Sequence, residues 1–173
     1  VASNGFAATY AGSSHSVGVS VIAGDGLGMQ TDGDYASAVH ASDLADAAAV
    51  GRRAGERAVA RLNARKVTTG RYPVLYDRRV AGGLLRHLIG AISGPAVARG
   101  TSFLKDRLGH RVFAPGINII DDPHVRRGHR SKPFDAEGVA NRRRGVVADG
   151  FLQTWLLDLG SARQLGMKTT GHA

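Results

Sequence analysis

The sequence predicts an α+β fold, in which a β-hairpin and a long helix end one domain and a second helix, followed by a β-rich segment, begins another. Residues 17–30 alternate apolar and polar side chains around a turn signal at Asp25-Gly26. Residues 42–66 and 80–93 instead carry apolar side chains at helical spacing. Beyond Pro95, short apolar runs between Gly and Pro residues are typical of strands and loops. These patterns together favour a chain with two structural regions.

The first region begins with the hairpin. Val17–Ala23 alternates and contains β-branched residues, so it is expected to be a strand. The segment Gly26–Gln30 is expected to return beside it as the antiparallel partner. Because an isolated two-stranded hairpin is marginal in water, we expect further strands, supplied by residues that precede Val1.

A long helix is expected from Ser42, as its N-cap, to about Lys66. Asp43 and Asp46 lie in the first turn and Arg65 in the last, so each charge suits the helix dipole. The face expected to pack is rich in alanine and comprises Leu44, Ala47, Ala48, Gly51, Ala54, Ala58, Val59 and Leu62.

The domain boundary is placed directly after this helix. Residues 1–67 are expected to form the end of an α+β region, and residues 68–173 the start of a C-terminal β-rich domain. Thr68-Thr69-Gly70 ends the helix, and Tyr72–Tyr76 is expected to form a strand with its proline near the start.

The second helix is expected over Val80–Ser93. Its apolar face comprises Val80, Leu84, Leu85, Leu88, Ile89 and Ile92. Gly83, Gly90 and Gly94 lie on roughly the opposite face. A glycine in a helix is destabilising by roughly 1 kcal/mol relative to alanine. We therefore expect the glycine face to pack closely against another segment or a partner subunit.

The rest of the chain is expected to consist of strands and turns. Strands are expected at Arg111–Phe113 and Ile117–Ile120, and a hairpin at Val146–Leu152. Phe134–Gly138 is expected to form an acidic turn. Thr154–Leu157 either continues as a strand or enters a short helix that contains Ala162 and Leu165.

Composition excludes several classes of protein. The 173 residues include 43% hydrophobic and 21% charged residues, as in soluble globular proteins. Cysteine is absent, so neither a disulfide nor a thiolate zinc site can form within this chain, and a cytoplasmic location is expected. No segment has the roughly 20 consecutive apolar residues that span a bilayer, and the segment after Val1 is polar. Neither secretion nor membrane insertion is expected.

The net charge of +9 is unevenly distributed. All 23 Lys and Arg residues lie in residues 52–173, whereas residues 1–51 contain five aspartates and no Lys or Arg. Basic clusters occur at Arg126–Lys132 and Arg142–Arg144, but no aromatic side chains alternate with them. A solvated or protein-contacting surface is therefore favoured over nucleic-acid binding.

Catalytic motifs are scarce. No histidine is followed by glutamate, as the His-Glu-x-x-His zinc motif requires. A metal site of Asp121, Asp122, His124 and His129 is conceivable, but neighbouring arginines oppose a cation. Neither a cysteine nor a Gly-x-Ser-x-Gly nucleophile is present, and Gly24–Gly28 lacks the Lys-Ser/Thr of a phosphate-binding loop. Asp135 and Glu137 could serve in acid–base catalysis, although a structured turn explains them better.

A series of short motifs resembles the TldD/PmbA metalloprotease family along nearly the whole chain. The motifs, in order, are Ser3–Phe6, Asp34-Tyr35, Val50–Arg52, Thr69–Val74, Ala91–Gly94, Thr101–Leu104, Asp121–Pro123, Pro133–Gly138 and Ser161–Arg163. The resemblance is closer to the PmbA (TldE) branch, described as a modulator of DNA gyrase, than to the TldD branch. Family members are longer, so the chain corresponds to their central portion.

The resemblance implies a cytoplasmic heterodimer that cleaves peptides. The TldD subunit carries the zinc ligands, in a His-Glu-x-x-x-His motif and a downstream cysteine. Counting back without gaps from Gly100–Ser102 places the motif positions on Leu85, Arg86 and Gly90, none of which can replace its counterpart. The resemblance therefore implies a chain without catalytic or metal-binding residues of its own, whose zinc belongs to a TldD-like companion.

Three hypotheses follow. The first is a structural partner subunit that shapes the dimer and the peptide cavity, with the residues Gly83, Arg86, His87, Gly90 and Gly94 lining the dimer contact or the cavity. The second is an active metallopeptidase whose ligands lie outside this segment. The third is a basic module that binds DNA or an acidic protein. Self-association is an alternative to the TldD-like partner, and His172 stands where the family pattern usually has asparagine.

Overall fold

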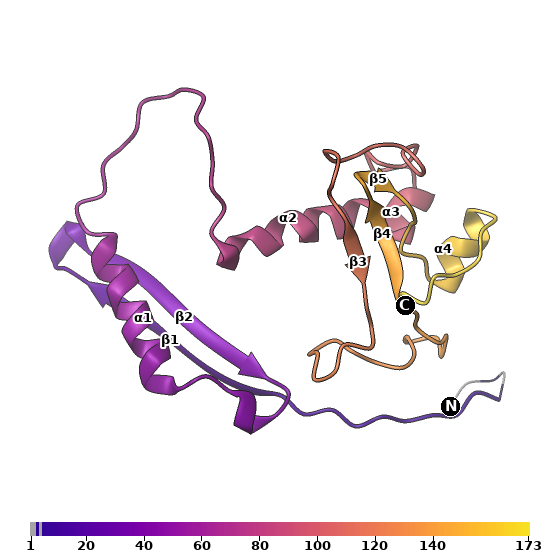
Figure 1. The fold of residues 1–173 in the computed structure, drawn as a ribbon, viewed down its shortest axis with the longest axis horizontal. Helices are drawn as coiled ribbons and strands as arrows, with labels where there is room; N and C mark the ends of the chain where they lie inside the picture. Colours follow the sequence, from indigo (N-terminus) through magenta and orange to yellow (C-terminus); the bar gives the residue numbers. More distant parts are fainter. Residues whose placement is uncertain (1–2, 4) are drawn as a thin grey trace. The chain divides into compact units, whose positions relative to one another are not determined.

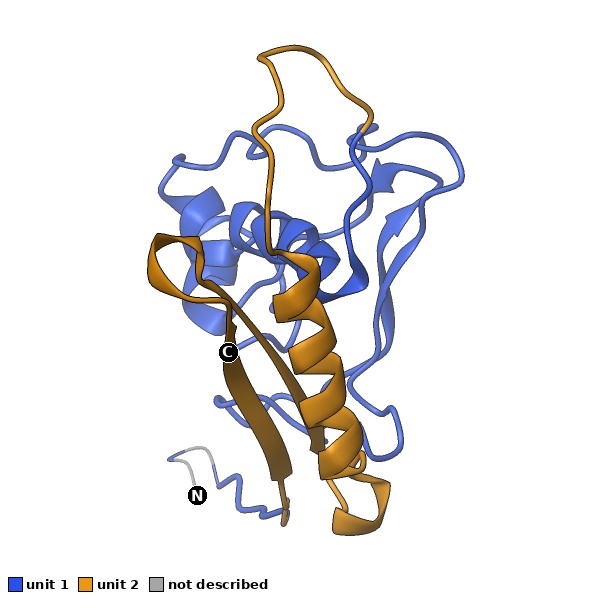
Figure 2. Cartoon of the chain, turned by 90° about the vertical axis from the view of Figure 1, so that its left-hand side faces the viewer, with its two compact units in different colours: residues 1–10, 74–173 blue, residues 11–73 orange. Residues whose placement is uncertain are grey.

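The computed structural model describes residue 3 and residues 5–173. The chain divides into two compact units, which Figure 2 shows in different colours. One unit comprises Ala11–Pro73, and the other comprises Val74–Ala173 with the described part of residues 1–10. Helices and strands occur in both units, which confirms the α+β class. The domain limit expected after residue 67 stays a prediction, because a compact unit need not coincide with a domain.

The unit Ala11–Pro73 is built on a hairpin of β1 (His15–Ala23) and β2 (Gln30–Ala38) (Figure 1). The strands pair antiparallel in continuous register, from His15 opposite Ala38 to Ala23 opposite Gln30. The predicted hairpin is therefore confirmed, but the prediction that its second strand begins at Gly26 is wrong. Residues Gly26–Gly28 form the 3₁₀ turn η1, because Gly24 and Gly26 both adopt positive φ angles that suit a turn.

The helix of this unit, α1 (Ala47–Ala60), is shorter than predicted at both ends. Asp46 is its N-cap, with a carboxylate oxygen that accepts a hydrogen bond from Ala49 N at 2.9 Å. The predicted cap, Ser42, lies instead in the 3₁₀ turn η2 (Ala41–Asp43). At the other end, Asn63 adopts a left-handed conformation with φ 59°, which stops the helix before Lys66.

Only part of the predicted apolar stripe of α1 is buried. Val50, Ala54 and Ala58 are the buried residues of the helix, spaced four residues apart along one face. Val59, expected on the same face, is 60% exposed, and Val50 was not predicted to pack. The alanines allow α1 to lie close to the hairpin, which it contacts along both β1 and β2.

Arginines on α1 also bind the hairpin through Asp34. The Arg53 Nε donates to one Asp34 oxygen at 2.7 Å, and the Arg57 Nη1 donates to the other at 2.9 Å. These two hydrogen bonds, from Arg57 first and Arg53 second, lower the pKa of Asp34 from 3.8 to about 2. One turn further along, Arg61 Nη1 lies 3.2 Å from Asp32 Oδ2. Packing and charge thus hold the same two elements together.

The second unit contains a three-stranded antiparallel sheet in the order β3 (Ile119–Asp121), β4 (Arg144–Ala148), β5 (Phe151–Leu152). Asp149 and Gly150 join the last two strands with φ angles of 46° and 80°. Two positive φ angles in a two-residue loop are typical of a type I′ turn, which matches the twist of a hairpin. The hairpin predicted at Val146–Leu152 is therefore confirmed.

Three helices accompany this sheet: α2 (Arg78–Ala91), α3 (Gly94–Ala98) and α4 (Leu159–Gln164). The prediction of a helix over Val80–Ser93 is close to α2, which Asp77 caps through Arg79 N at 2.8 Å. Two predicted strands are absent, since Tyr72–Tyr76 has no regular structure and Arg111 makes only an isolated bridge to Phe151. The strand alternative for Thr154–Leu157 is wrong, because β5 ends at Leu152 and Leu156 makes only an isolated bridge to Ser93. The short helix is α4, which contains Ala162 and ends before Leu165.

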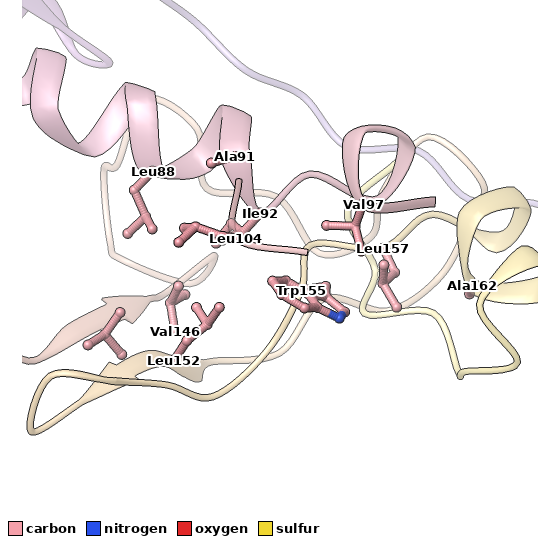
Figure 3. Close-up of a cluster of buried hydrophobic side chains, with 11 residues drawn as sticks. Leu88, Ala91, Ile92, Val97, Leu104, Val146, Leu152, Trp155, Leu157 and Ala162 are labelled. Atoms are coloured by element: carbon pink, nitrogen blue, oxygen red, sulfur yellow. The ribbon is translucent and has the colours of Figure 1, made fainter. Parts of the chain in front are cut away.

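The core of this unit gathers side chains from every helix and from β4 and β5. Trp155 lies in its middle, between the end of α2 and Leu157 (Figure 3). The buried members are Leu88, Ala91, Ile92, Val97, Leu104, Val146, Val147, Leu152, Trp155, Leu157 and Ala162. Gly94 allows the closest approach, because a Cβ at this position would overlap the side chain of Ser161.

The segment before the hairpin adds aromatic side chains to this unit. Phe6 and Tyr10 meet the Phe134 ring edge to face, at centroid distances of 5.1 and 5.3 Å. Phe6 also covers Gly138, which turns the chain with φ 77° and where a Cβ would lie less than 3 Å from the Phe6 ring. Residues 5–10 therefore pack on a turn more than a hundred positions away.

None of the helices in the described part of the chain is both long enough and apolar enough to span a membrane.

Candidate functional site

One side of α2 presents exposed apolar side chains. The helix contributes Leu88 and Ala91 to the core, and the chain then continues into buried Ile92. Val80, Leu84, Leu85 and Ile89 stay between 46% and 59% exposed. We call these four residues the α2 apolar face. Four of the six residues on the apolar face identified from the sequence are therefore exposed in the described chain.

The glycine face of α2 is also largely open. A Cβ added at Gly83 or Gly90 would meet no atom within 4 Å, whereas at Gly94 it would overlap Ser161. Arg86 and His87 are exposed on the same helix. Close packing within the described chain is thus found at Gly94 alone of the three glycines, and the contact expected for the other two stays a prediction.

The positions that match the zinc motif lie on this same helix. Leu85 belongs to the α2 apolar face, Arg86 is a cation, and Gly90 has no side chain. None of them offers an atom that binds zinc. Across residue 3 and residues 5–173, no three His, Asp or Glu side chains lie close enough together to hold a metal ion. The alternative metal site at Asp121, Asp122, His124 and His129 is therefore not assembled.

Asp121 and Asp122, the two aspartates of this alternative metal site, form ion pairs with other side chains. Asp121 Oδ2 lies 3.1 Å from His172 Nε2, and Asp122 Oδ2 lies 3.3 Å from Arg143 Nε. His172 Nδ1 lies 2.9 Å from the Thr170 hydroxyl, so a hydrogen-bonded series Thr170, His172, Asp121 forms. Sequence reasoning noted His172 but missed this series, because a separation of 51 residues carries no local pattern.

The order hydroxyl, imidazole, carboxylate resembles a nucleophilic triad, but the environment of Thr170 opposes that chemistry. The Thr170 hydroxyl is buried and accepts a hydrogen bond from Leu157 N at 2.6 Å. The Thr170 carbonyl accepts another from Arg144 Nη2 at 2.8 Å. A nucleophile must be reachable by its substrate and free to lose its proton. The series therefore fixes the end of the described chain against β3 and β4.

The acidic turn also has a structural role. Asp135 is buried, and its Oδ1 accepts hydrogen bonds from Glu137 N at 3.0 Å and Val139 N at 2.9 Å. Its Oδ2 accepts one from Ala173 N at 3.1 Å. Glu137 Oε2 accepts one from Leu159 N at 2.8 Å, at the start of α4. Because both carboxylates bind backbone N–H groups, the structured turn explains them, and neither is placed for acid–base catalysis.

Two family models together match nearly the whole chain. The PmbA/TldA metallopeptidase central domain matches residues 1–62, and the PmbA/TldA metallopeptidase C-terminal domain matches residues 69–173. The chain is 41% identical to the metalloprotease PmbA of Escherichia coli O157:H7 over 99% of its length, and 37% identical to the PmbA homolog of Haemophilus influenzae over 99%. It spans 38% of the length of each of these relatives.

Solved structures agree with the sequence comparison. A putative modulator of DNA gyrase from Bacteroides thetaiotaomicron superposes with a TM-score of 0.93 at 28% identity, over 99% of this chain and 39% of that one. TldE from Thermococcus kodakarensis shares the fold, with a TM-score of 0.69 at 20% identity over 91% of this chain and 36% of that one. The chain therefore belongs to the PmbA/TldD metallopeptidase family, with greater similarity to its PmbA branch.

Proposed function

We propose that this chain belongs to a TldE/PmbA-like subunit that takes part in peptide proteolysis without binding the catalytic zinc itself. In this proposal a TldD-like companion holds the zinc, and the present chain completes the dimer and shapes the peptide cavity. The observation that carries the proposal is α2, whose motif-equivalent positions Leu85, Arg86 and Gly90 supply no zinc ligand.

The exposure of the α2 apolar face supports a partner at this helix. Fully burying one Leu, Ile or Val side chain contributes about 1.5–3 kcal/mol, so four half-exposed side chains on one helix leave substantial stabilisation unused. An exposed apolar patch of this kind is typical of a protein interface. The open glycine positions Gly83 and Gly90 would let a second backbone approach the same helix closely.

The test is to produce the intact protein with and without a TldD-like companion, and to measure zinc content, co-purification and peptide cleavage. We expect a zinc-free chain that co-purifies with the companion and raises its peptidase activity. Leu84→Asp should abolish co-purification, because it places a charge in the proposed contact. Val59→Asp is the matched control, since Val59 is a similarly exposed apolar residue on α1.

Two results would contradict the proposal. Stoichiometric zinc with peptide hydrolysis by the intact protein alone would establish an active metallopeptidase with ligands outside this segment. Equal co-purification of the Leu84→Asp and Val59→Asp proteins would remove α2 from the contact. DNA retention that falls steeply with salt would instead support the basic-module hypothesis.

A further inference from the structure

A pocket in the unit that contains Val74–Ala173 is lined by several basic side chains and by no acidic side chain. It has a volume of about 500 Å³ and lies between the segment 139–144, α4 and the segment 167–170. Four basic side chains line it: Arg142, Arg144, Arg163 and Lys168. We call this the basic pocket. The four cations come from two parts of the sequence, residues 142–144 and residues 163–168, which the fold brings together.

These cations are not neutralised by the chain. Within the described residues, no carboxylate forms an ion pair with any of the four. Arg144 is the most enclosed of them: its Nη2 donates to Thr170 O at 2.8 Å, and its buried Nε has no hydrogen-bond partner. A guanidinium carries five N–H donors, so Arg144 keeps donors for a further acceptor.

The rest of the lining favours a peptide over a nucleic acid. Apolar atoms of Val139, Leu159 and Met167 contribute to the wall, and no aromatic side chain that could stack on a base is among the lining residues of this described region. A pocket lined by apolar atoms and four basic side chains suits a short aliphatic stem that ends in a carboxylate. Arginine matches carboxylates particularly well, because its planar fork can donate two parallel hydrogen bonds.

We propose that the basic pocket binds a carboxylate of an acidic peptide segment. The carboxylate is either the terminal one or that of a Glu or Asp side chain, and the chemistry at the pocket is the same. This site does not involve α2 and does not depend on which subunit holds zinc. It would give the protein a way to select acidic segments, separate from any peptidase site.

The experiment measures fluorescence anisotropy of the intact protein with a fluorescein-labelled hexapeptide that ends in Leu-Glu-Glu. Parallel probes are its C-terminally amidated form and a form with both Glu residues replaced by Gln. Loss of binding on amidation alone would identify the terminal carboxylate, and loss on Gln replacement alone would identify the side chains; both results support the site. Absence of binding by the acidic peptide at low salt overturns the proposal.

Two double variants separate the pocket from general charge attraction. Arg163→Gln with Lys168→Gln should weaken peptide binding about tenfold or more, since each lost charge-assisted hydrogen bond is large enough for such a change. Arg65→Gln with Arg126→Gln removes the same charge elsewhere and should change the Kd less than about twofold. Arg163→Lys should retain part of the binding. Unchanged Trp155 fluorescence would show that this unit is folded in each variant, because Trp155 is the single tryptophan and is buried in this unit.

Equal weakening by the two double variants would overturn the proposal. Binding of a duplex DNA that competes with the peptide and shows the same loss in the Arg163→Gln/Lys168→Gln protein would also overturn it, because the pocket would then be part of a nucleic-acid surface.

Discussion

His172 and Asp121 join the last residues of the chain to strand β3, with His172 Nε2 3.1 Å from Asp121 Oδ2. The imidazole also reaches Thr170 through its other nitrogen, so both ring nitrogens are engaged. Replacing the imidazole would therefore remove one hydrogen-bond partner from the Thr170 hydroxyl and one from the Asp121 carboxylate.

We expect His172→Ala to lower the free energy of unfolding of the second unit by about 1 kcal/mol, because it removes two hydrogen bonds in a partly buried site. Urea unfolding monitored by Trp155 fluorescence measures this. His124→Ala is the control, since His124 is exposed and, within the described residues, only its backbone N–H forms a hydrogen bond. Equal midpoints for the two variants would show that the series contributes nothing.

The charge of Asp34 should make the packing of α1 on its hairpin sensitive to acid. The pKa is lowered on folding, from 3.8 to about 2, so the ionised carboxylate stabilises the folded unit above pH 3.8. This contribution is lost as the pH falls from 3.8 toward about 2. Asp34→Asn should therefore weaken hydrogen-exchange protection of the α1 amides near neutral pH, and match the parent protein near pH 2.

Asp25→Asn is the control for this experiment, because Asp25 is an exposed carboxyl in the hairpin turn. It should leave the protection of the α1 amides unchanged at every pH. A constant difference between Asp34→Asn and the parent across the whole acid range would contradict the assigned titration.

Two glycines near α2 should respond in opposite ways to the same substitution. Gly94→Ala should lower stability by about 1–3 kcal/mol, because the added methyl group would overlap Ser161 in a packed contact. Gly83→Ala meets open space and should raise stability by up to about 1 kcal/mol, through helix propensity alone. Thermal unfolding followed by Trp155 fluorescence compares them. Destabilisation of the isolated chain by Gly83→Ala would be inconsistent with the open surface.

The arginines at 142–144 should differ from one another, although they are adjacent in sequence. Arg142→Gln should alter stability by less than about 0.5 kcal/mol and Arg143→Gln by less than about 1 kcal/mol, since Arg143 makes an exposed pair with Asp122. Arg144→Gln should lower it by about 1–2 kcal/mol, because its Nη2 binds Thr170 O in a partly buried contact. Equal effects at the three positions, measured by urea unfolding, would contradict these contacts.

Sequence patterns were most informative where local physics decides the structure. The hairpin loop Asp149-Gly150 was predicted because turn preferences act over a few residues, and α2 was predicted because its apolar side chains recur at helical spacing. The start of α1 was missed because Ser42 and Asp46 are both residue types that cap helices well, so cap preference alone did not distinguish them. Tyr72–Tyr76 shows the same limit, because strand propensity without a pairing partner leaves an irregular segment.

The candidate sites depended still more on contacts between distant residues. The chemistry of Leu85, Arg86 and Gly90 was readable from their side chains, but the exposure of the α2 apolar face was not, because helical periodicity does not say what covers a face. The basic pocket was only half visible in the sequence, which marked the cluster Arg142–Arg144 but not the residues that lie opposite it. Arg163 and Lys168 are ordinary surface residues until the fold places them beside Arg142 and Arg144.

The contact of Phe6 and Tyr10 with Phe134 has a consequence for chain connectivity. Residues 11–73 form one compact unit that is inserted between two segments of the other, so the chain passes between the units twice. Proteolysis within the exposed segment 64–76 would sever one crossing. The amino-terminal fragment would then stay attached to the carboxy-terminal fragment through the contact of Phe6 and Tyr10 with Phe134. Side-chain packing would replace the cut peptide bond as the link between the two fragments.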